Sequence, residues 1–106
     1  MPTFIMLTRL SHGALKSPRS IERLSHEIAE HVRQECPQVH WQANYAILGP
    51  ADYLDIFTAP DNASATKVAT IIRTFGHATT EIWPATEWEQ FVQMVATLPP
   101  VVVASS

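Results

Sequence analysis

The segment Tyr-Ala-Ile-Leu-Gly-Pro-Ala-Asp-Tyr-Leu-Asp-Ile-Phe-Thr-Ala-Pro, residues 45–60, holds two runs of strand-forming residues on either side of a Gly-Pro turn. This pattern is typical of a β-hairpin. We therefore predict a strand over residues 39–48, a turn over 49–51 and a second strand over 52–59. Acidic side chains on the second strand make the hairpin a candidate for a functional site as well as the centre of the fold.

The residues before the hairpin predict one strand and one helix. Thr3–Leu10 is a short apolar run rich in strand formers. Ser17 and Pro18 suit the cap and first position of a helix, which must end near Cys36 because a proline follows it. The spacing of the apolar residues predicts one buried stripe on this helix: Ile21, Leu24, Ile28 and Val32.

The residues after the hairpin predict a second helix, a strand and a third helix. Asp61 or Asn62 caps the second helix, and Gly76 ends it. A strand is predicted over residues 78–83. A third amphipathic helix is predicted over residues 87–98, because its apolar residues recur at helical spacing until the Pro-Pro pair.

The predicted order is strand, helix, strand, strand, helix, strand, helix. Right-handed crossovers around a central hairpin lead to an α+β, ferredoxin-like split βαβ fold, with a four-stranded antiparallel sheet in the order 4-1-3-2 and helices on one face. We predict a single domain over residues 1–98 and a C-terminal tail over 99–106. The open sheet face would be partly apolar, which favours face-to-face packing of two copies as a dimer. The apolar residues expected there are Ile5, Leu7, Ala46, Phe57 and Trp83.

Composition excludes several classes of partner. The 106 residues carry a net charge of -3 and no clustered basic face, so we expect no nucleic acid or anionic membrane as a partner. A single cysteine allows no internal disulfide, and the N-terminus lacks the features of a signal peptide. The expected localisation is cytoplasmic. The three glycines are scattered, so no phosphate loop is present and we expect no cofactor.

The open sheet face is also the predicted ligand site. If Leu54 and Ile56 face the helices, strand alternation places Tyr53 and Asp55 on the open side. The same reasoning brings further candidates to that side: Gln42, Asn44, Thr79 and Glu81. Arg9 on the first strand joins them if Phe4 and Met6 face the helices. Such a mixture suits a small polar ligand with an apolar body, and unequal environments would separate the pKa values of the two carboxyl groups. The alternative is that these groups bond to one another across a dimer.

Histidines suggest a second candidate at the rim of the sheet. His12 and His77 are expected at the same edge as Asp52 in the hairpin turn. Two imidazoles and a carboxylate are able to bind a transition metal or to act as acid and base. The chain has no tight ligand spacing, so we interpret these histidines as solvated or capping groups and expect no metal site. Cys36 is interpreted as a structural cysteine.

The chain resembles the GYD-domain family of small bacterial and archaeal proteins, which belongs with the dimeric α+β barrel proteins. The resemblance rests on residues 2–8, 48–55 and 59–61 and on Gly76 with residues 79–81. The family's Gly, Tyr and Asp map to Gly49, Ala51 and Asp52, so the tyrosine is replaced here. The resemblance implies a homodimer with a pocket inside the barrel or between sheet and helices. Its relatives differ too widely in activity for the fold to select one.

Three functions are consistent with these observations. The leading hypothesis is a homodimeric protein that binds or senses a small molecule in a cavity on the open sheet face. The second is a cofactor-independent enzyme of oxygenase or isomerase type, which would use Asp55, Glu81 or His77 to carry protons. The third is a structural scaffold without a ligand, for which a dry and fully packed interior is expected.

Overall fold

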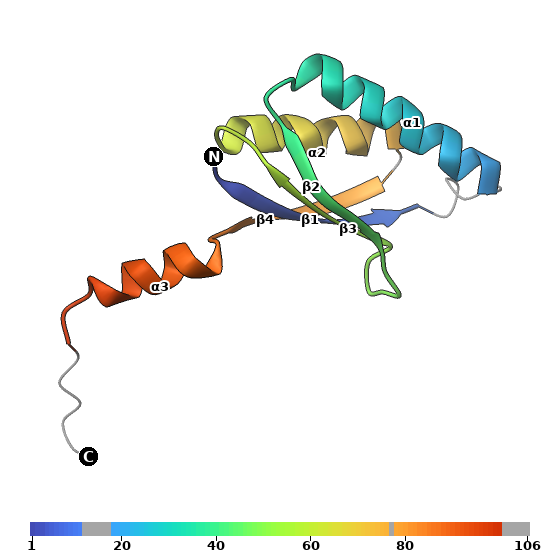
Figure 1. Ribbon diagram of the computed structural model, residues 1–106. Helices are drawn as coiled ribbons and strands as arrows, with labels where there is room; N and C mark the ends of the chain where they lie inside the picture. Colours follow the sequence, from blue (N-terminus) through green and yellow to red (C-terminus); the bar gives the residue numbers. More distant parts are fainter. Residues whose placement is uncertain (12–17, 77, 101–106) are drawn as a thin grey trace.

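The computed structural model describes residues 1–11, 18–76 and 78–100. It confirms the predicted α+β class, with the sheet order β2-β3-β1-β4, which is 4-1-3-2 read from the other edge (Figure 1). The predicted helix cap Ser17 and residues 101–106 of the predicted tail lie outside the described residues. The elements are β1 (Thr3–Leu10), α1 (Pro18–Glu35), β2 (His40–Ala46), β3 (Tyr53–Thr58), α2 (Asn62–Gly76), β4 (Ala78–Ala85) and α3 (Trp88–Ala96).

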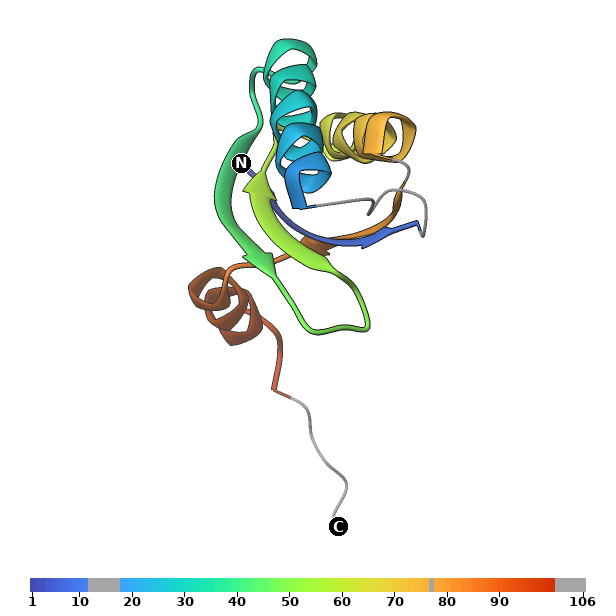
Figure 2. The ribbon, with the colours of Figure 1, turned by 90° about the vertical axis from the view of Figure 1, so that its right-hand side faces the viewer.

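Helices α1 and α2 cover one face of the sheet, and the core lies between these two layers (Figure 2). On the strands the core consists of Phe4, Met6 and Phe57, and the rings of Phe4 and Phe57 stack with centroids 5.5 Å apart. Helix α2 contributes Val68 and Ile72 to the same cluster. Burial of these apolar side chains is the main force that holds the helices on the sheet.

The hairpin loop between β2 and β3 is attached to the end of β1. Within the loop, the Ile47 amide donates a hydrogen bond to the Asp52 carbonyl over 2.9 Å. Asp52 then bonds β1 twice: its amide donates to the Thr8 carbonyl, and its carboxylate Oδ2 accepts from the Leu10 amide over 2.8 Å. Gly49 has φ +90°, and an added Cβ would meet nothing within 4 Å, so backbone conformation rather than space favours glycine there.

The strand register corrects the predicted faces of β3. Phe57 pairs with Phe4, Asp55 with Met6 and Tyr53 with Thr8. Paired residues share a face of the sheet, so Tyr53 and Asp55 face the helices, while Leu54 and Ile56 lie on the open face. The prediction had these faces reversed. Phe57 decides the orientation, because the largest apolar side chain of β3 joins the helix-side core.

A β-bulge in β2 also breaks the alternation assumed from the sequence. Trp41 pairs with Phe57 and Ala43 with Ile56, which leaves Gln42 without a partner in the ladder. A bulge of this kind shifts all later side chains to the other face. As a result, Trp41 and Asn44 both lie on the helix side.

Strand β4 continues through Pro84 to Ala85, two residues beyond the predicted end. This proline is tolerated because β4 is an edge strand. The predicted arrangement of helices on one face holds for α1 and α2, whereas α3 leaves the sheet and projects from the domain (Figure 1). In the portion of the chain that the structure describes, no helix combines the length and apolarity needed to cross a membrane.

Candidate functional site

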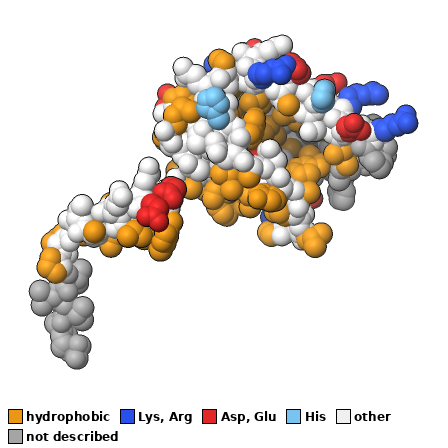
Figure 3. Space-filling model, viewed as in Figure 1, with side chains coloured by type: hydrophobic (Ala, Val, Ile, Leu, Met, Phe, Trp, Pro, Cys, Tyr) orange, Lys and Arg blue, Asp and Glu red, His pale blue; other side chains and the backbone are white. Residues whose placement is uncertain are grey.

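A cavity of about 470 Å³ lies between α1 and the strands on the helix side of the sheet. It forms because α1 reaches the core mainly at its C-terminal end, where Val32 is buried and the His31 ring stacks on Phe75 of α2 with centroids 4.1 Å apart. Toward its N-terminus, α1 lines the cavity with side chains that are only half-buried: Ile21, Leu24 and Ile28. Figure 3 shows the apolar recess between α1 and the strands.

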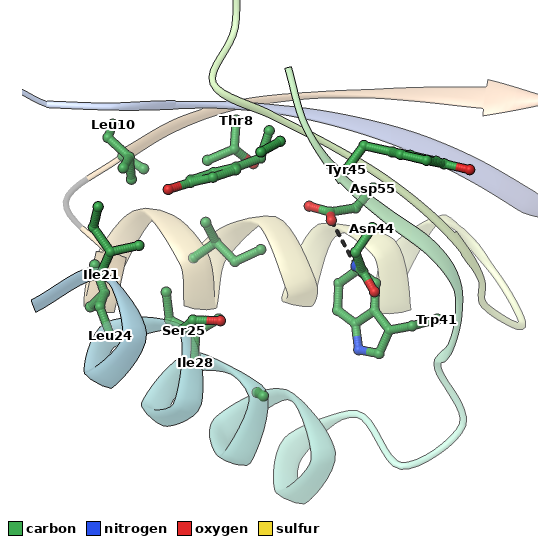
Figure 4. Close-up of a pocket in the computed structure, with 15 residues that line it drawn as sticks. Thr8, Leu10, Ile21, Leu24, Ser25, Ile28, Trp41, Asn44, Tyr45 and Asp55 are labelled. Atoms are coloured by element: carbon green, nitrogen blue, oxygen red, sulfur yellow. Dashed lines mark hydrogen bonds between the residues drawn. The ribbon is translucent and has the colours of Figure 1, made fainter. Parts of the chain in front are cut away.

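The strands supply the polar wall of this cavity. The carboxyl group of Asp55 projects from β3 into the space between the strands and α1 (Figure 4). Asn44 on β2 donates a hydrogen bond from Nδ2 to Asp55 Oδ1 over 2.7 Å. Tyr53 and Thr8 also line the cavity. One carboxylate oxygen is thereby fixed, and the described residues give the other, Oδ2, no hydrogen bond.

Burial raises the pKa of the Asp55 carboxyl above its ordinary value of 3.8, while the hydrogen bond from Asn44 acts in the opposite direction. The apolar surroundings explain this direction, because they disfavour the charged form. No basic side chain is among the described residues that line the cavity. The cavity therefore holds an uncompensated acidic group, which favours a bound hydrogen-bond donor or cation and disfavours an anion.

Thr8 is a second polar group of interest. Its side chain is 4% exposed and borders the cavity, and among the described residues its hydroxyl has no hydrogen-bond partner. A buried hydroxyl without a partner is uncommon and calls for an explanation such as water or a ligand.

The predicted ligand residues do not form one site. Asn44, Tyr53 and Asp55 come together on the helix side. Arg9 and Glu81 lie on the open face, because their neighbours in the register, Thr79 and Leu7, point away from the helices. The predicted open-face position of Asn44, Tyr53 and Asp55 is therefore wrong. On that face a shallow recess of about 150 Å³ is lined by Leu7, Arg9, Ala51, Thr79, Thr80 and Glu81.

Of the three rim candidates, the structure describes only Asp52. Asp52 fixes the hairpin to β1, and His12 and His77 lie outside the described residues. Across residues 1–11, 18–76 and 78–100, no three His, Cys, Asp or Glu side chains gather as a metal site would require. Cys36 is buried, and burial raises the pKa of its thiol. A raised pKa makes a thiol less reactive, which agrees with a structural role.

Several cavity residues were not among the sequence candidates. Thr8 continues the alternation of Phe4 and Met6 on β1, so its helix-side position could have been found from the strand pattern. Trp41 is the second such residue. Its ring packs edge-on against Phe57 with centroids 5.2 Å apart and closes one end of the cavity. Only the bulge at Gln42 reveals that Trp41 and Asn44 share a face.

The fold and the cavity define this chain as a ferredoxin-like α+β protein with a recess between sheet and helices. A family model described as the GYD domain matches residues 4–95, so the chain belongs to the GYD-domain family. No curated protein matches the sequence. The crystal structure of At3g17210 from Arabidopsis thaliana is similar to this chain with a TM-score of 0.52 and 12% identity, over 82% of this chain and 95% of that one. At this identity the similarity shows the fold alone.

Proposed function

We propose that this GYD-domain protein binds a small molecule in the cavity between α1 and the sheet. The observation that carries the proposal is the Asp55 carboxyl group, which sits in a largely apolar cavity with one oxygen held by Asn44 and the other without a partner among the described residues. The cavity volume falls in the range of small-molecule sites. The half-buried stripe of α1 would contact the apolar body of the ligand.

The charge of the cavity selects the ligand chemistry. The free oxygen of Asp55 accepts hydrogen bonds, so the ligand presents a hydroxyl or ammonium group to it. A charged partner would also offset the cost of burying the carboxylate. The alternative of a scaffold without a ligand is disfavoured on this side of the sheet, because its expected dry packing is replaced by about 470 Å³ of space.

Binding of three matched probes tests this proposal: 2-phenylethylamine, 2-phenylethanol and phenylacetate. We expect the amine and the alcohol to raise the melting temperature and the carboxylate to have no effect. At ten times the dissociation constant, binding adds about 1.4 kcal/mol of stability, or about 6–11 °C. Asp55→Asn should weaken binding of the amine, whereas Glu81→Gln, on the opposite face, should not. Equal loss in both variants, or no probe binding in the wild type, contradicts the proposal.

A cofactor-independent enzyme is the second candidate, and the raised pKa of Asp55 favours it. A carboxyl group whose pKa is shifted toward neutrality is suited to act as a general base. Of the three proton carriers considered, Asp55 lines the cavity, Glu81 lies on the other face and His77 lies outside the described residues. If the protein is an enzyme, Asp55→Asn should abolish turnover while a neutral ligand still binds.

We also propose that the chain forms a homodimer through the open sheet face. The strand register places Ile5 on this face between Ile56 and Trp83, and it places Leu7 beside Leu54. Trp83 is 49% exposed. A contiguous apolar surface of this kind is typical of an interface. Leu54→Glu places a charge in this patch and should convert a dimer to a monomer in light-scattering measurements.

A further inference from the structure

Among the described residues, no other helix or strand packs closely against α3. It projects from the end of β4 on the side of the sheet opposite α1 and α2, as both ribbon views show (Figures 1 and 2). None of its residues is buried. Glu87 caps its N-terminus by accepting a hydrogen bond from the Gln90 amide over 3.3 Å, and Thr97 caps its C-terminus.

The exposed surface of α3 is strongly two-sided. Trp88 is 69% exposed and Val92 is 45% exposed. At 100° per residue, these side chains lie on the same side of the helix as two further apolar residues, Phe91 and Val95. We call these four residues the α3 stripe. The opposite side of the helix carries Glu89, Gln90 and Gln93.

A helix of nine residues, such as α3, is not stable in water without packing contacts. Isolated helices shorter than about 12–15 residues are marginal even with good helix formers. A cap contributes about 1 kcal/mol, which does not change this conclusion. Packing of the apolar stripe must therefore supply the stability, and the described part of the chain offers no surface to α3.

The chain is more extended, and exposes more surface, than a compact domain of its length. A compact domain of this length has a radius of gyration of about 13 Å, whereas this chain has 17.6 Å. A folded monomer of 11.8 kDa exposes about 5,900 Å², whereas this chain exposes 7805 Å². Part of this excess belongs to α3, whose large apolar side chains are all exposed, and a standard interface buries roughly 800 Å² on each partner.

We propose that α3 is an arm that packs its apolar stripe on a second copy of this chain. The proposal rests on the proposed pairing through the open sheet face, and it is independent of the ligand. Because α3 lies on the open-face side of the sheet, a second copy seated on that face comes within its reach (Figure 2). Two-fold symmetry makes the exchange reciprocal, so each copy covers the stripe of the other.

Two substitutions on α3 test the arm. Val92→Asp puts a charge into the stripe, and Gln93→Asp puts the same charge on the polar side of the same helix as a matched control. Neither residue is buried in its own chain, so both variants should fold, which circular dichroism would verify. By sedimentation, we expect the wild type to be a dimer of about twice 11.8 kDa. Val92→Asp should raise the dissociation constant at least about 100-fold, and Gln93→Asp should change it less than about threefold.

Hydrogen exchange in residues 87–98 separates the remaining outcomes. Protection that rises with protein concentration supports docking on a second copy. A monomeric wild type overturns the proposal, and so does equal protection of these residues in the wild-type dimer and in a monomeric Leu54→Glu variant, because α3 then packs on its own chain. A dimer that Leu54→Glu dissociates but Val92→Asp does not would refute the arm and leave the pairing through the sheet face intact.

Discussion

Replacing Asn44 with alanine removes the one hydrogen bond that the described residues make to the Asp55 carboxyl group. The Nδ2–Oδ1 distance of 2.7 Å is short, as expected for a donor to a charged acceptor. Such bonds contribute about 1.5–3 kcal/mol when fully enclosed. Because Asn44 is exposed and Asp55 is half-buried, water partly replaces the lost donor. We therefore expect Asn44→Ala to cost about 1 kcal/mol at pH 7, or about 4–8 °C in melting temperature.

The same substitution should change the pH dependence of stability. Burial raises the Asp55 pKa above 3.8, and the Asn44 hydrogen bond lowers it. The folded state thus binds the proton more tightly than the unfolded state. The contribution of Asp55 to stability is fully present below its pKa in the unfolded state, and it is lost as the pH rises through its pKa in the folded state. Without Asn44 the folded pKa rises further, so the loss extends to higher pH.

Carbon-detected NMR titration of the Asp55 carboxyl group measures its pKa directly, and urea unfolding between pH 3 and pH 8 measures the stability. Gln42→Ala is the matched control, because Gln42 lies on the same strand, is exposed and sits in the bulge without a ladder partner. An Asp55 pKa at or below 3.8 in the wild type refutes the reasoning. So does an Asn44→Ala variant whose pKa and stability match those of Gln42→Ala.

Three further substitutions test the fold around the site. Phe57→Ala should cost about 3–5 kcal/mol in urea unfolding, because Phe57 is fully buried between Phe4 and Trp41, whereas Leu48→Ala on the exposed loop should change stability by less than about 0.5 kcal/mol. Arg73 donates hydrogen bonds from Nε and Nη2 to the Thr80 side chain and carbonyl, each over 2.8 Å. Arg73→Met should therefore lower the free energy of unfolding by about 1–3 kcal/mol and speed hydrogen exchange in β4. Arg33 forms an exposed ion pair with Glu30, so the control Arg33→Met should cost less than about 1 kcal/mol. Asp52→Ala should lower the free energy of unfolding by about 1–2 kcal/mol, because it leaves the Leu10 amide unpaired. Asp52→Asn keeps an acceptor for that amide and should restore most of the lost stability. An Asn variant as unstable as the Ala variant would show that the charge of Asp52, rather than its hydrogen bond, stabilises the loop.

The element order and the sheet order could be predicted because they depend on local signals. The stripe of α1, the turn at Gly49 and the end of α2 at Gly76 are all encoded by nearby residues. The face of each strand could not be predicted equally well. Strand β3 is apolar on both sides, with Leu54 and Ile56 on one and Phe57 on the other, so hydrophobicity alone did not decide which side meets the helices.

The site depended on two features that are not local. The bulge at Gln42 brings Asn44 to the helix side, where it meets Asp55. The cavity exists because the N-terminal half of α1 stands away from the sheet, although its apolar stripe predicted a packed core. The helical pattern of α3 was likewise visible in the sequence, but a pattern does not show which surface a helix packs on.

The location of ligand binding is tested most directly by an NMR titration of the labelled protein with 2-phenylethylamine. Binding in the helix-side cavity predicts saturable chemical-shift changes at Asn44, Tyr53, Asp55 and Ile28, all of which line that cavity. These changes should be lost in Asp55→Asn. Changes confined to Arg9, Thr79 and Glu81 on the open face, or no saturable changes at all, would contradict the proposed site.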